Sequence, residues 1–517
     1  MAAMLLAAVL TAAPTGLPPH GSCADLATIA LPDTMIRSAA EVTGRSFALP
    51  GSTAIDNLPP FCRLVAVTRP AVNFEVWLPL SNWNGKFQGV GNGANAGSIS
   101  YAAMAAALRR GYAAASTDTG HATRNARDGS WALGHPELVI DFAYRALHLT
   151  TDHAKQIVKA FYRQPPTHSY FVSCSTGGRQ ALMEAQKFPD DYDGIIAGDP
   201  AANWTHFQLG GHLWIVLALN KDPESYIPAS KLQLLNTAVN AACDAGDGIV
   251  DGVLDDPRTC KFDPQVLACR NGQDAASCLS AKQIKAVKDI WSGARTSSGN
   301  VVYPAYMPGA EATGGWASYM TGTGPLTGNH WEQADNVLKY MVFENPKWDF
   351  RTFDYDKDVA LADAKLGTIM DAFDPDLSRF RQRGAKLILY HGWNDPSISP
   401  INTINYYERV VSLLQGRQRR QQAETSAQEF VRLFMVPGML HCGGGPGPST
   451  FDMLSALENW VENGRAPERV IASHSANGVE DRTRPLCVYP KAAVYVGRGS
   501  TDDAANFVCQ MREKSER

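Results

Sequence analysis

The chain has 517 residues, of which 45% are hydrophobic and 19% charged, and a net charge of −4. This length exceeds what one hydrophobic core normally holds, so we expect two domains or one domain with a large insertion. The charge balance gives no indication of nucleic-acid binding. The one basic run, at 416–424, has no interleaved aromatic residues and is interpreted as a solvated helix or loop.

The N-terminal sequence MAAMLLAAVLTAAPTG contains an apolar stretch of about ten residues, too short for a bilayer but typical of a signal-peptide core. The charged start of such a peptide is missing, because no Lys or Arg precedes Arg37. We predict a signal peptide over 1–22 without placing its cleavage site. No later stretch is apolar enough for a membrane span.

Ten cysteines indicate the compartment. Their even number and loop-like surroundings favour a disulfide framework and an oxidising environment. A zinc site would need paired C-x-x-C spacings, which the sequence lacks. We expect a secreted or periplasmic monomer with no nucleic-acid or membrane partner.

Short apolar runs alternate with helix-like stretches before residue 200 and again near the end of the chain. The expected strands are 74–80, 85–91, 111–117, 169–174, 194–198, 385–392 and 431–439. The stretch 139–162 has helical periodicity. This alternation predicts an α/β fold with a doubly wound, mostly parallel sheet.

The segment 202–383 differs, with four cysteines, several tryptophans and no strand–helix alternation. We interpret it as an insertion folded over the sheet. The α/β domain is then formed by 23–201 and 384–517.

The stretch SYFVSCSTGGRQALMEAQ predicts a strand, a tight turn and a helix, with Ser175 at the turn. Gly177 and Gly178 permit the close approach that a strained turn requires. The arrangement matches a nucleophile elbow, which lifts a serine hydroxyl above the edge of the sheet. The first glycine of the G-x-S-x-G pattern is Ser173 here, a residue small enough to fit.

An acid and a histidine follow in the order that this kind of site requires. Asp395 comes just after one buried strand, in LILYHGWNDPSISP, and His441 just after another, in LFMVPGMLHCGGGPG. Catalytic groups of open α/β sheets collect at such strand ends. We predict that Ser175 is the nucleophile, His441 the general base and then acid, and Asp395 the group that orients the imidazole.

Two backbone N–H groups are expected to bind the oxyanion. One belongs to Thr176, directly after the nucleophile, and the other to the loop GVGNGANAG, most simply at Ala94. Taken alone, that loop is also compatible with an ordinary glycine-rich turn.

Cys174 precedes the serine and Cys442 follows the histidine. A disulfide between them would tie nucleophile and base together through adjacent backbone positions. A rival interpretation makes Cys174 the nucleophile, since thiolates are intrinsically stronger nucleophiles. His121 is a competing base, but it precedes the serine, in the wrong chain order.

Cys-Ser, HGWND and VPGMLHCGGGPG together resemble the tannase and feruloyl esterase family of α/β-hydrolases, which also includes bacterial mono(2-hydroxyethyl) terephthalate hydrolases. The likeness extends from about Cys23 to Cys509. It implies that 202–383 is a lid domain and that a disulfide joins the neighbours of the serine and the histidine. The other implied bridges are Cys23–Cys62, Cys243–Cys260, Cys269–Cys278 and Cys487–Cys509; sequence alone leaves many connectivities open.

The stretch CDAGDGIVDGVLDDPRTC, at 243–260, carries aspartates among glycines that allow tight turns. Such carboxylates, with backbone carbonyls, can bind a hard cation, although the spacing is not that of an EF-hand and an exposed acidic loop is the alternative. The resemblance implies a structural Ca²⁺ site and no organic cofactor. Its ligands would be the side chains of Asp244, Asp247 and Asp251 and the carbonyls of Ile249 and Val253.

The lid is expected to supply the acyl pocket. Trp316 resembles the family's lid aromatic, against which a substrate ring packs, with ordinary lid core as the alternative. His391 and Ile398, which flank Asp395, are candidates for the same pocket.

Terephthalate monoester hydrolases use a lid arginine to bind the free carboxylate. This sequence has no Arg between Arg295 and Arg351, although Lys339 could substitute. The absence favours feruloyl, cinnamoyl or galloyl esters.

The predicted protein is an exported serine carboxylic ester hydrolase that cleaves small aromatic esters through an acyl-enzyme. One alternative is a hydrolase of mono(2-hydroxyethyl) terephthalate or a related synthetic ester. Two others are an inactive binding protein on the same fold and a metal-dependent hydrolase. The complete Ser–Asp–His set argues against an inactive protein.

Overall fold

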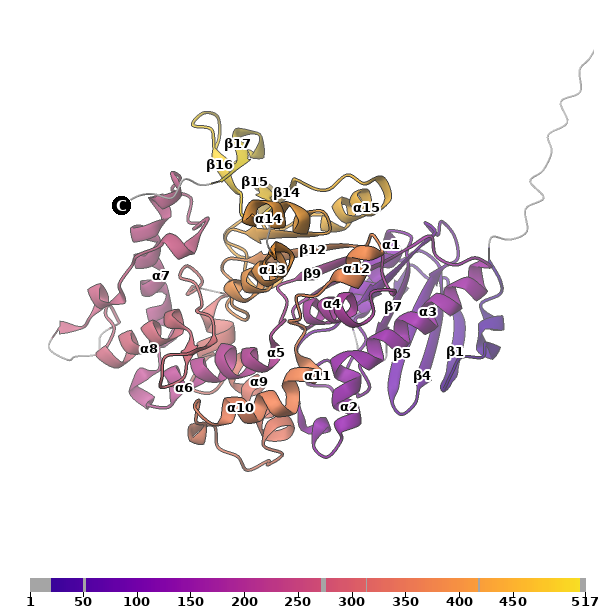
Figure 1. The fold of residues 1–517 in the computed structure, drawn as a ribbon, viewed down its shortest axis with the longest axis horizontal. Helices are drawn as coiled ribbons and strands as arrows, with labels where there is room; N and C mark the ends of the chain where they lie inside the picture. The colour runs from indigo at the N-terminus through magenta and orange to yellow at the C-terminus, as the bar shows by residue number, and fades with distance from the viewer. Residues whose placement is uncertain (1–19, 50–52, 271–275, 313, 417–418, 512–517) are drawn as a thin grey trace, which may run out of the picture.

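The computed structural model describes residues 20–49, 53–270, 276–312, 314–416 and 419–511. Most of the predicted signal peptide therefore lies outside the described residues. Figure 1 shows a central sheet with helices packed along it and a helical region gathered at one side.

Nine strands of the described chain form the central sheet. They are β1 (Thr34–Val42), β4 (Phe61–Thr68), β5 (Val72–Pro79), β6 (Lys86–Val90), β7 (Ala113–Thr117), β8 (His168–Cys174), β9 (Gly194–Gly198), β12 (Lys386–Gly392) and β13 (Val431–Val436). Their order is β1-β4-β5-β7-β6-β8-β9-β12-β13.

The sheet is antiparallel from β1 to β7 and parallel from β7 to β13. The predicted mostly parallel, doubly wound sheet is confirmed for the strands that form its centre. β1 and β4 were not predicted. The central strands are buried on both faces, which explains why they are continuous apolar runs.

Helices cover both faces of the sheet. One face carries α3 (Ala146–Tyr162), α4 (Thr176–Lys187), α12 (Ser378–Gln382), α13 (Pro400–Gln415) and α14 (Arg420–Gln428). The other carries α1 (Tyr101–Arg109) and α15 (Met453–Asn463). In α3 the buried residues Ala154, Ile157, Val158 and Phe161 recur at helical spacing and pack against the sheet. The predicted helix 139–162 continues back through a π-helical turn into α2 (Pro136–Ile140).

The segment 202–383 contributes most of a second hydrophobic cluster, which includes Trp204, Leu213, Val287 and Trp316 and also Phe142. Its helices are α5 (Trp204–His206), α6 (Trp214–Asn220), α7 (Ala229–Cys243), α8 (Ala281–Ser292), α9 (Asn329–Val337), α10 (Asp358–Ala362) and α11 (Thr368–Met370). A small hairpin joins β10 (Ala294–Arg295) to β11 (Val301–Tyr303). We call this region the lid.

Short hairpins complete the described chain. They are β2 (Ser46–Phe47) with β3 (Ile55–Asp56), β14 (Arg469–Ala476) with β15 (Val479–Cys487), and β16 (Ala492–Tyr495) with β17 (Phe507–Gln510). Within the described ranges, the helices are all too short or too polar to cross a bilayer. All ten cysteines are bonded in the pairs that the resemblance implied.

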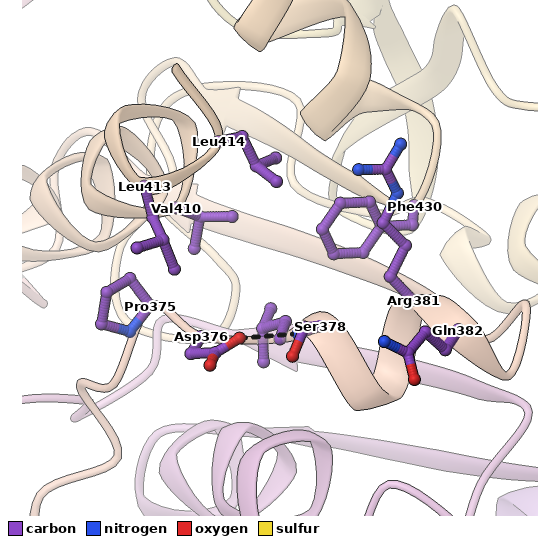
Figure 2. A pocket seen from close by; sticks show the side chains of 10 residues that line it. Pro375, Asp376, Ser378, Arg381, Gln382, Val410, Leu413, Leu414 and Phe430 are labelled. Atoms are coloured by element: carbon purple, nitrogen blue, oxygen red, sulfur yellow. Dashed lines mark hydrogen bonds between the residues drawn. The ribbon is translucent and has the colours of Figure 1, made fainter. Parts of the chain in front are cut away.

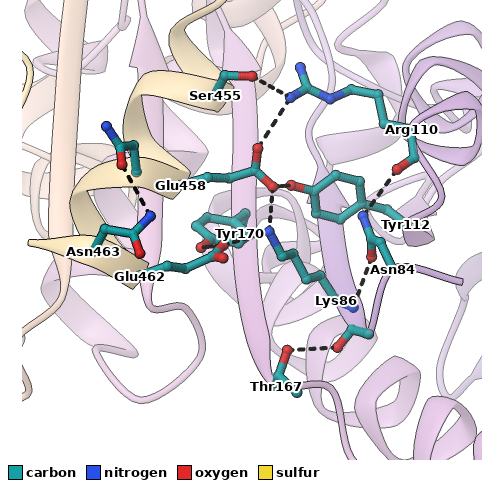
Figure 3. A network of polar contacts seen from close by, with 12 residues as sticks. Asn84, Lys86, Arg110, Tyr112, Thr167, Tyr170, Ser455, Glu458, Glu462 and Asn463 are labelled. Carbon is teal, nitrogen blue, oxygen red and sulfur yellow. Dashed lines mark hydrogen bonds and ion pairs between the residues drawn. The ribbon is translucent and has the colours of Figure 1, made fainter. Parts of the chain in front are cut away.

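A polar network fixes α15 to the sheet at the edge opposite the carboxyl ends of the parallel strands (Figure 3). Lys86, at the start of β6, places its Nζ 2.8 Å from Glu458 and 2.6 Å from Glu462. The hydroxyl of Tyr170 donates to Glu462 at 2.6 Å, and that of Tyr112 donates to Glu458. The two glutamates lie one helical turn apart, so Lys86 bridges both, and Arg110 also pairs with Glu458 at 3.2 Å.

Replacing Lys86 by Met should lower the free energy of unfolding by about 2 kcal/mol, because Glu462 then loses its lysine partner and Glu458 keeps only Arg110. Urea denaturation measures the change. Lys365→Met is the matched control, since its partner Glu344 is exposed and such pairs contribute under about 1 kcal/mol. Equal losses in the two variants would contradict a structural role for the network.

Candidate active site

Ser175 lies in the tight turn between β8 and α4, where its backbone takes φ 68° and ψ −129°. Its N–H donates to the carbonyl of Gly198, at the end of β9, at 2.9 Å. A Cβ on Gly177 would lie 1.9 Å from Oγ of Ser173, and one on Gly178 would lie 2.3 Å from the Gly198 oxygen. Close packing therefore requires both glycines, and the strained turn presents the serine hydroxyl at the carboxyl edge of the sheet.

The structure brings Ser175, His441 and Asp395 into one hydrogen-bonded line. Nε2 of His441 lies 2.8 Å from Oγ of Ser175, and its Nδ1 lies 2.7 Å from Oδ2 of Asp395. The other oxygen of Asp395 accepts the N–H groups of Ser397 at 2.7 Å and Ile398 at 2.9 Å. Because a carboxylate only accepts, Nδ1 carries the proton, which leaves Nε2 free to accept from the serine.

Burial and charge tune this line. Burial alone would raise the pKa of Asp395, but the charge and hydrogen bonds of His441 and His391 hold it well below its usual range. Burial alone would lower the pKa of His441, whereas Asp395 and the charge of Asp199 raise it above its usual value. The site therefore contains an ionised acid and a strengthened base.

Thr176 and Ala94 lie side by side at the expected oxyanion position. Oγ of Thr176 donates to the carbonyl of Ala94 at 2.7 Å. Thr176 opens α4, so its N–H has no acceptor within the helix and can bind an anion. Ala94 is held in the left-handed region with φ 49°.

His121 supports this loop. Its Nε2 lies 2.9 Å from the carbonyl of Asn95, and its ring stacks on Trp131 at 3.8 Å. Burial lowers its pKa to about 4. The ring thus braces the residue next to Ala94, while His441 is the histidine in contact with the nucleophile.

The Cys174 and Cys442 sulfurs are bonded to each other, with their Cα atoms 5.9 Å apart. Cys174 is therefore not a free thiol, which removes the rival nucleophile. The bridge joins positions separated by 268 residues and places the serine and histidine loops next to each other.

The three expected pocket residues are all buried. Trp316 packs in the lid core, with its ring centroid 6.3 Å from that of Trp291. Ile398 is 1% exposed, and His391 lies beside Asp395 with its Nε2 3.1 Å from the carboxylate. Their contact with a substrate stays a prediction.

Tyr319, which the sequence did not single out, is the lid aromatic that faces the triad. Its ring lies edge-on to His441 with the centroids 5.7 Å apart. It belongs to the π-helical turn Ala317–Thr321, one turn beyond Trp316. The segment TGGWASYM indicated an aromatic at this place, but not which of its two aromatic residues turns toward the site.

Lys339, the possible substitute for a lid arginine, places its Nζ 2.7 Å from Asp335. Its charge is thus neutralised within α9 and the turn that follows it. A free carboxylate on a substrate would have to compete with this ion pair.

The acidic loop 243–260 is closed by the Cys243–Cys260 bridge. Backbone N–H groups of the loop donate to the carboxylates of Asp244, Asp247 and Asp251. Two arginines of β15, Arg482 and Arg484, also reach Asp251, at 3.2 and 2.8 Å. The expected carbonyl ligands, Ile249 and Val253, lie in the same loop.

A groove of about 580 Å³ lies elsewhere, where α12 faces α13 (Figure 2). Its wall includes Val410, Leu413, Leu414 and Phe430. Asp376 accepts the N–H of Ser378 at 2.9 Å at its floor. This groove holds no pair of nucleophile and base, so we do not place the chemistry there.

Comparison with known proteins gives the same picture. A sequence model of the family described as "Tannase and feruloyl esterase" matches residues 55–510. An uncharacterized esterase of Xanthomonas campestris pv. campestris is 42% identical over 94% of this chain and 91% of its own. Feruloyl esterase B of Aspergillus niger is 33% identical over 84% of this chain and 83% of its own.

Solved structures extend the likeness to the fold. The crystal structure of feruloyl esterase B from Aspergillus oryzae has a TM-score of 0.84 at 30% identity, covering 95% of this chain and all of that one (100%). Tannin acyl hydrolase from Aspergillus niger has a TM-score of 0.77 at 24% identity, covering 93% and 92%. This likeness confirms the predicted α/β-hydrolase fold.

Reaction with an organic fluorophosphonate should label Ser175, because a hydroxyl that His441 deprotonates attacks phosphorus. His441→Ala should slow labelling at least about 10³-fold, whereas His121→Ala should leave most of it. Mass spectrometry of the labelled peptide measures both rates. A loss confined to His121→Ala would transfer the role of base to that residue.

Proposed function

The chain belongs to the tannase and feruloyl esterase family of carboxylic ester hydrolases, and on this premise we propose that it hydrolyses feruloyl-, cinnamoyl- or galloyl-type aromatic esters through an acyl-enzyme. The observation that carries the proposal is the hydrogen-bonded line from Ser175 through His441 to Asp395. The oxyanion position beside it supports acyl transfer.

In the proposed mechanism, Oγ of Ser175 attacks the ester carbonyl while Nε2 of His441 takes its proton. The N–H groups of Thr176 and Ala94 bind the tetrahedral oxyanion. His441 then returns the proton to the leaving alcohol, and the acyl-enzyme forms. A water molecule then attacks the acyl-enzyme while His441 takes its proton. Return of that proton to Oγ of Ser175 releases the carboxylic acid. Asp395 stabilises the imidazolium in both halves.

The lid supports an aromatic and uncharged acyl group. The ring of Tyr319 lies in edge contact with His441 and therefore borders the triad, where a substrate ring can pack beside it. Lys339 is paired with Asp335, which leaves it less available to a free terephthalate carboxylate. A terephthalate monoester is therefore the less favoured substrate.

Methyl ferulate and methyl gallate should have higher kcat/KM values than mono(2-hydroxyethyl) terephthalate, and Ser175→Ala should abolish all three activities. Tyr319→Ala should lower kcat/KM for methyl ferulate by up to about tenfold, as loss of one aromatic contact predicts, whereas Tyr319→Phe should retain it. p-Nitrophenyl acetate, which lacks an aromatic acyl ring, is the control substrate. A preference for the terephthalate ester would overturn the substrate assignment.

We also propose that the loop 243–260 binds a structural Ca²⁺. Three aspartate carboxylates and backbone carbonyls in one disulfide-closed loop are the types of donor that calcium prefers, which supports the proposal. Asp244, Asp247 and Asp251 would hold it with the carbonyls of Ile249 and Val253. The ion would neutralise the loop and stabilise the lid, with no part in the ester chemistry.

Added Ca²⁺ should raise the melting temperature of protein treated with a chelator, because an ion that binds only the folded lid stabilises it by mass action. Differential scanning calorimetry measures the shift, and Asp247→Asn should lose it. Brief chelation should leave turnover in place, unlike in a metal-dependent hydrolase. Equal melting with and without Ca²⁺ would mean that Arg482 and Arg484 alone balance the loop.

Export to a secreted or periplasmic location is part of the proposal. The five disulfides of the described chain support it, because such bridges persist in oxidising compartments.

A further inference from the structure

A second buried carboxylate, that of Asp199, lies behind the triad and has no part in the mechanism described above. Asp199 directly follows β9, at the same edge of the sheet as Ser175 and Asp395. Its side chain is fully buried (0% exposed), and its backbone takes φ 36°, a left-handed conformation. A buried charge in a strained backbone needs a physical reason.

Both oxygens of Asp199 accept backbone N–H groups. Oδ1 accepts the N–H of Gly392, at the end of β12, at 2.9 Å. Oδ2 accepts the N–H of Cys442 at 2.5 Å and lies 3.4 Å from Sγ of Cys174. Burial raises the pKa of Asp199 above its usual value, whereas the charge of His391 and the Gly392 N–H act in the opposite direction. Because both oxygens accept N–H groups, these contacts favour the ionised carboxylate. Asp199 therefore joins the loop of Asp395 to the loop of His441.

The disulfide alone does not fix the histidine. It limits the distance between the Cys174 and Cys442 backbones to 5.9 Å between Cα atoms. Rotation of the peptide before Cys442 would still swing the His441 ring. The hydrogen bond from the Cys442 N–H to Asp199 removes this rotation.

His391 supplies the compensating charge. Its Nε2 lies 3.1 Å from Asp395 and 3.8 Å from Asp199, and 3.1 Å from the carbonyl of Ile398. All three neighbours are acceptors, so Nε2 carries a proton. Nδ1 lies 2.7 Å from Oγ of Thr403, a hydroxyl that can accept a hydrogen bond from a second ring proton. Burial alone would lower the pKa of His391, but Asp199 and Asp395 raise it above its usual value.

We propose that Asp199 is a positioning residue, whose carboxylate aligns His441 with Ser175 through the Cys442 N–H and, compensated by His391, makes His441 a stronger base. Only the effect of Asp199 on turnover rests on the proposed esterase function. The alignment and the charge are properties of the folded chain.

The other groups that face His441 add little charge. From the lid, Tyr319, His212 and His330 approach it; burial lowers the pKa of both histidines, to about 3 for His330, so they are neutral. Arg127, which acts on Tyr319 and His212, pairs with Glu332 at 3.7 Å. The charges that raise the pKa of His441 are therefore those of Asp395 and Asp199, and His391 lies beside both carboxylates.

The sign of the effect follows from these charges. His441 must be neutral to accept the serine proton, so kcat/KM rises with pH through the pKa of His441. Removal of the negative charge of Asp199 lowers that pKa and moves the acidic limb to lower pH. Removal of the positive charge of His391 moves it to higher pH.

Asp199→Asn should lower kcat for methyl ferulate by at least about tenfold with KM within about twofold, because a misaligned base slows the chemical step more than binding. The acidic limb of its pH profile should move to lower pH. Asp193→Asn, at the opposite end of β9, removes a charge from the same strand and should leave the limb in place. A fall in kcat without a shifted limb, or an unchanged kcat, would overturn the proposal.

NMR titration of the His441 imidazole, assigned with His441→Gln, gives the same comparison without turnover. The pKa of His441 should fall in Asp199→Asn and rise in His391→Gln. If Asp199→Asn does not fold, His391→Gln alone tests the proposal. An unmoved pKa would contradict the proposal. If the wild-type chain hydrolysed no aromatic ester, the proposed function would fail while this titration still tested Asp199.

Discussion

The hydrogen bonds from Ser175 through His441 to Asp395 join three loops that the rest of the molecule holds in place. Each loop follows a strand of the parallel half of the sheet, so the carboxyl edge brings them to one place. The strained turn at Ser175 persists because glycines permit close packing around it. The disulfide between Cys174 and Cys442 then limits the separation of nucleophile and base.

Burial makes the charges at this edge effective. Asp395, Asp199 and His391 are all buried away from water. Charges in a buried site interact more strongly than charges at the surface. Their mutual attraction offsets the cost of burial only because backbone N–H groups satisfy the carboxylates. The lid covers the same edge and places Tyr319 against His441. Catalytic geometry and lid packing are therefore parts of one arrangement.

Local signals were sufficient for the residues that follow apolar runs. Ser175, Asp395 and His441 each follow a strand with a buried apolar stretch, and such stretches are readable in the sequence. β1 was missed because it is an edge strand with partly exposed residues and weak alternation. Asp199 carries the same signal as Asp395, since it follows the run GIIAG, but nothing local distinguishes it from an ordinary turn aspartate.

The sequence by itself determined the strands at the centre of the sheet, the chain order of serine, acid and histidine, and the chemistry available at the turns. Only the tertiary structure decided that Trp316 belongs to the lid core while Tyr319 meets the triad, and that His391 and Asp199 lie behind Asp395. The reason is physical: periodicity along a chain shows which residues are buried, whereas the partner that each buried group meets depends on segments hundreds of residues away.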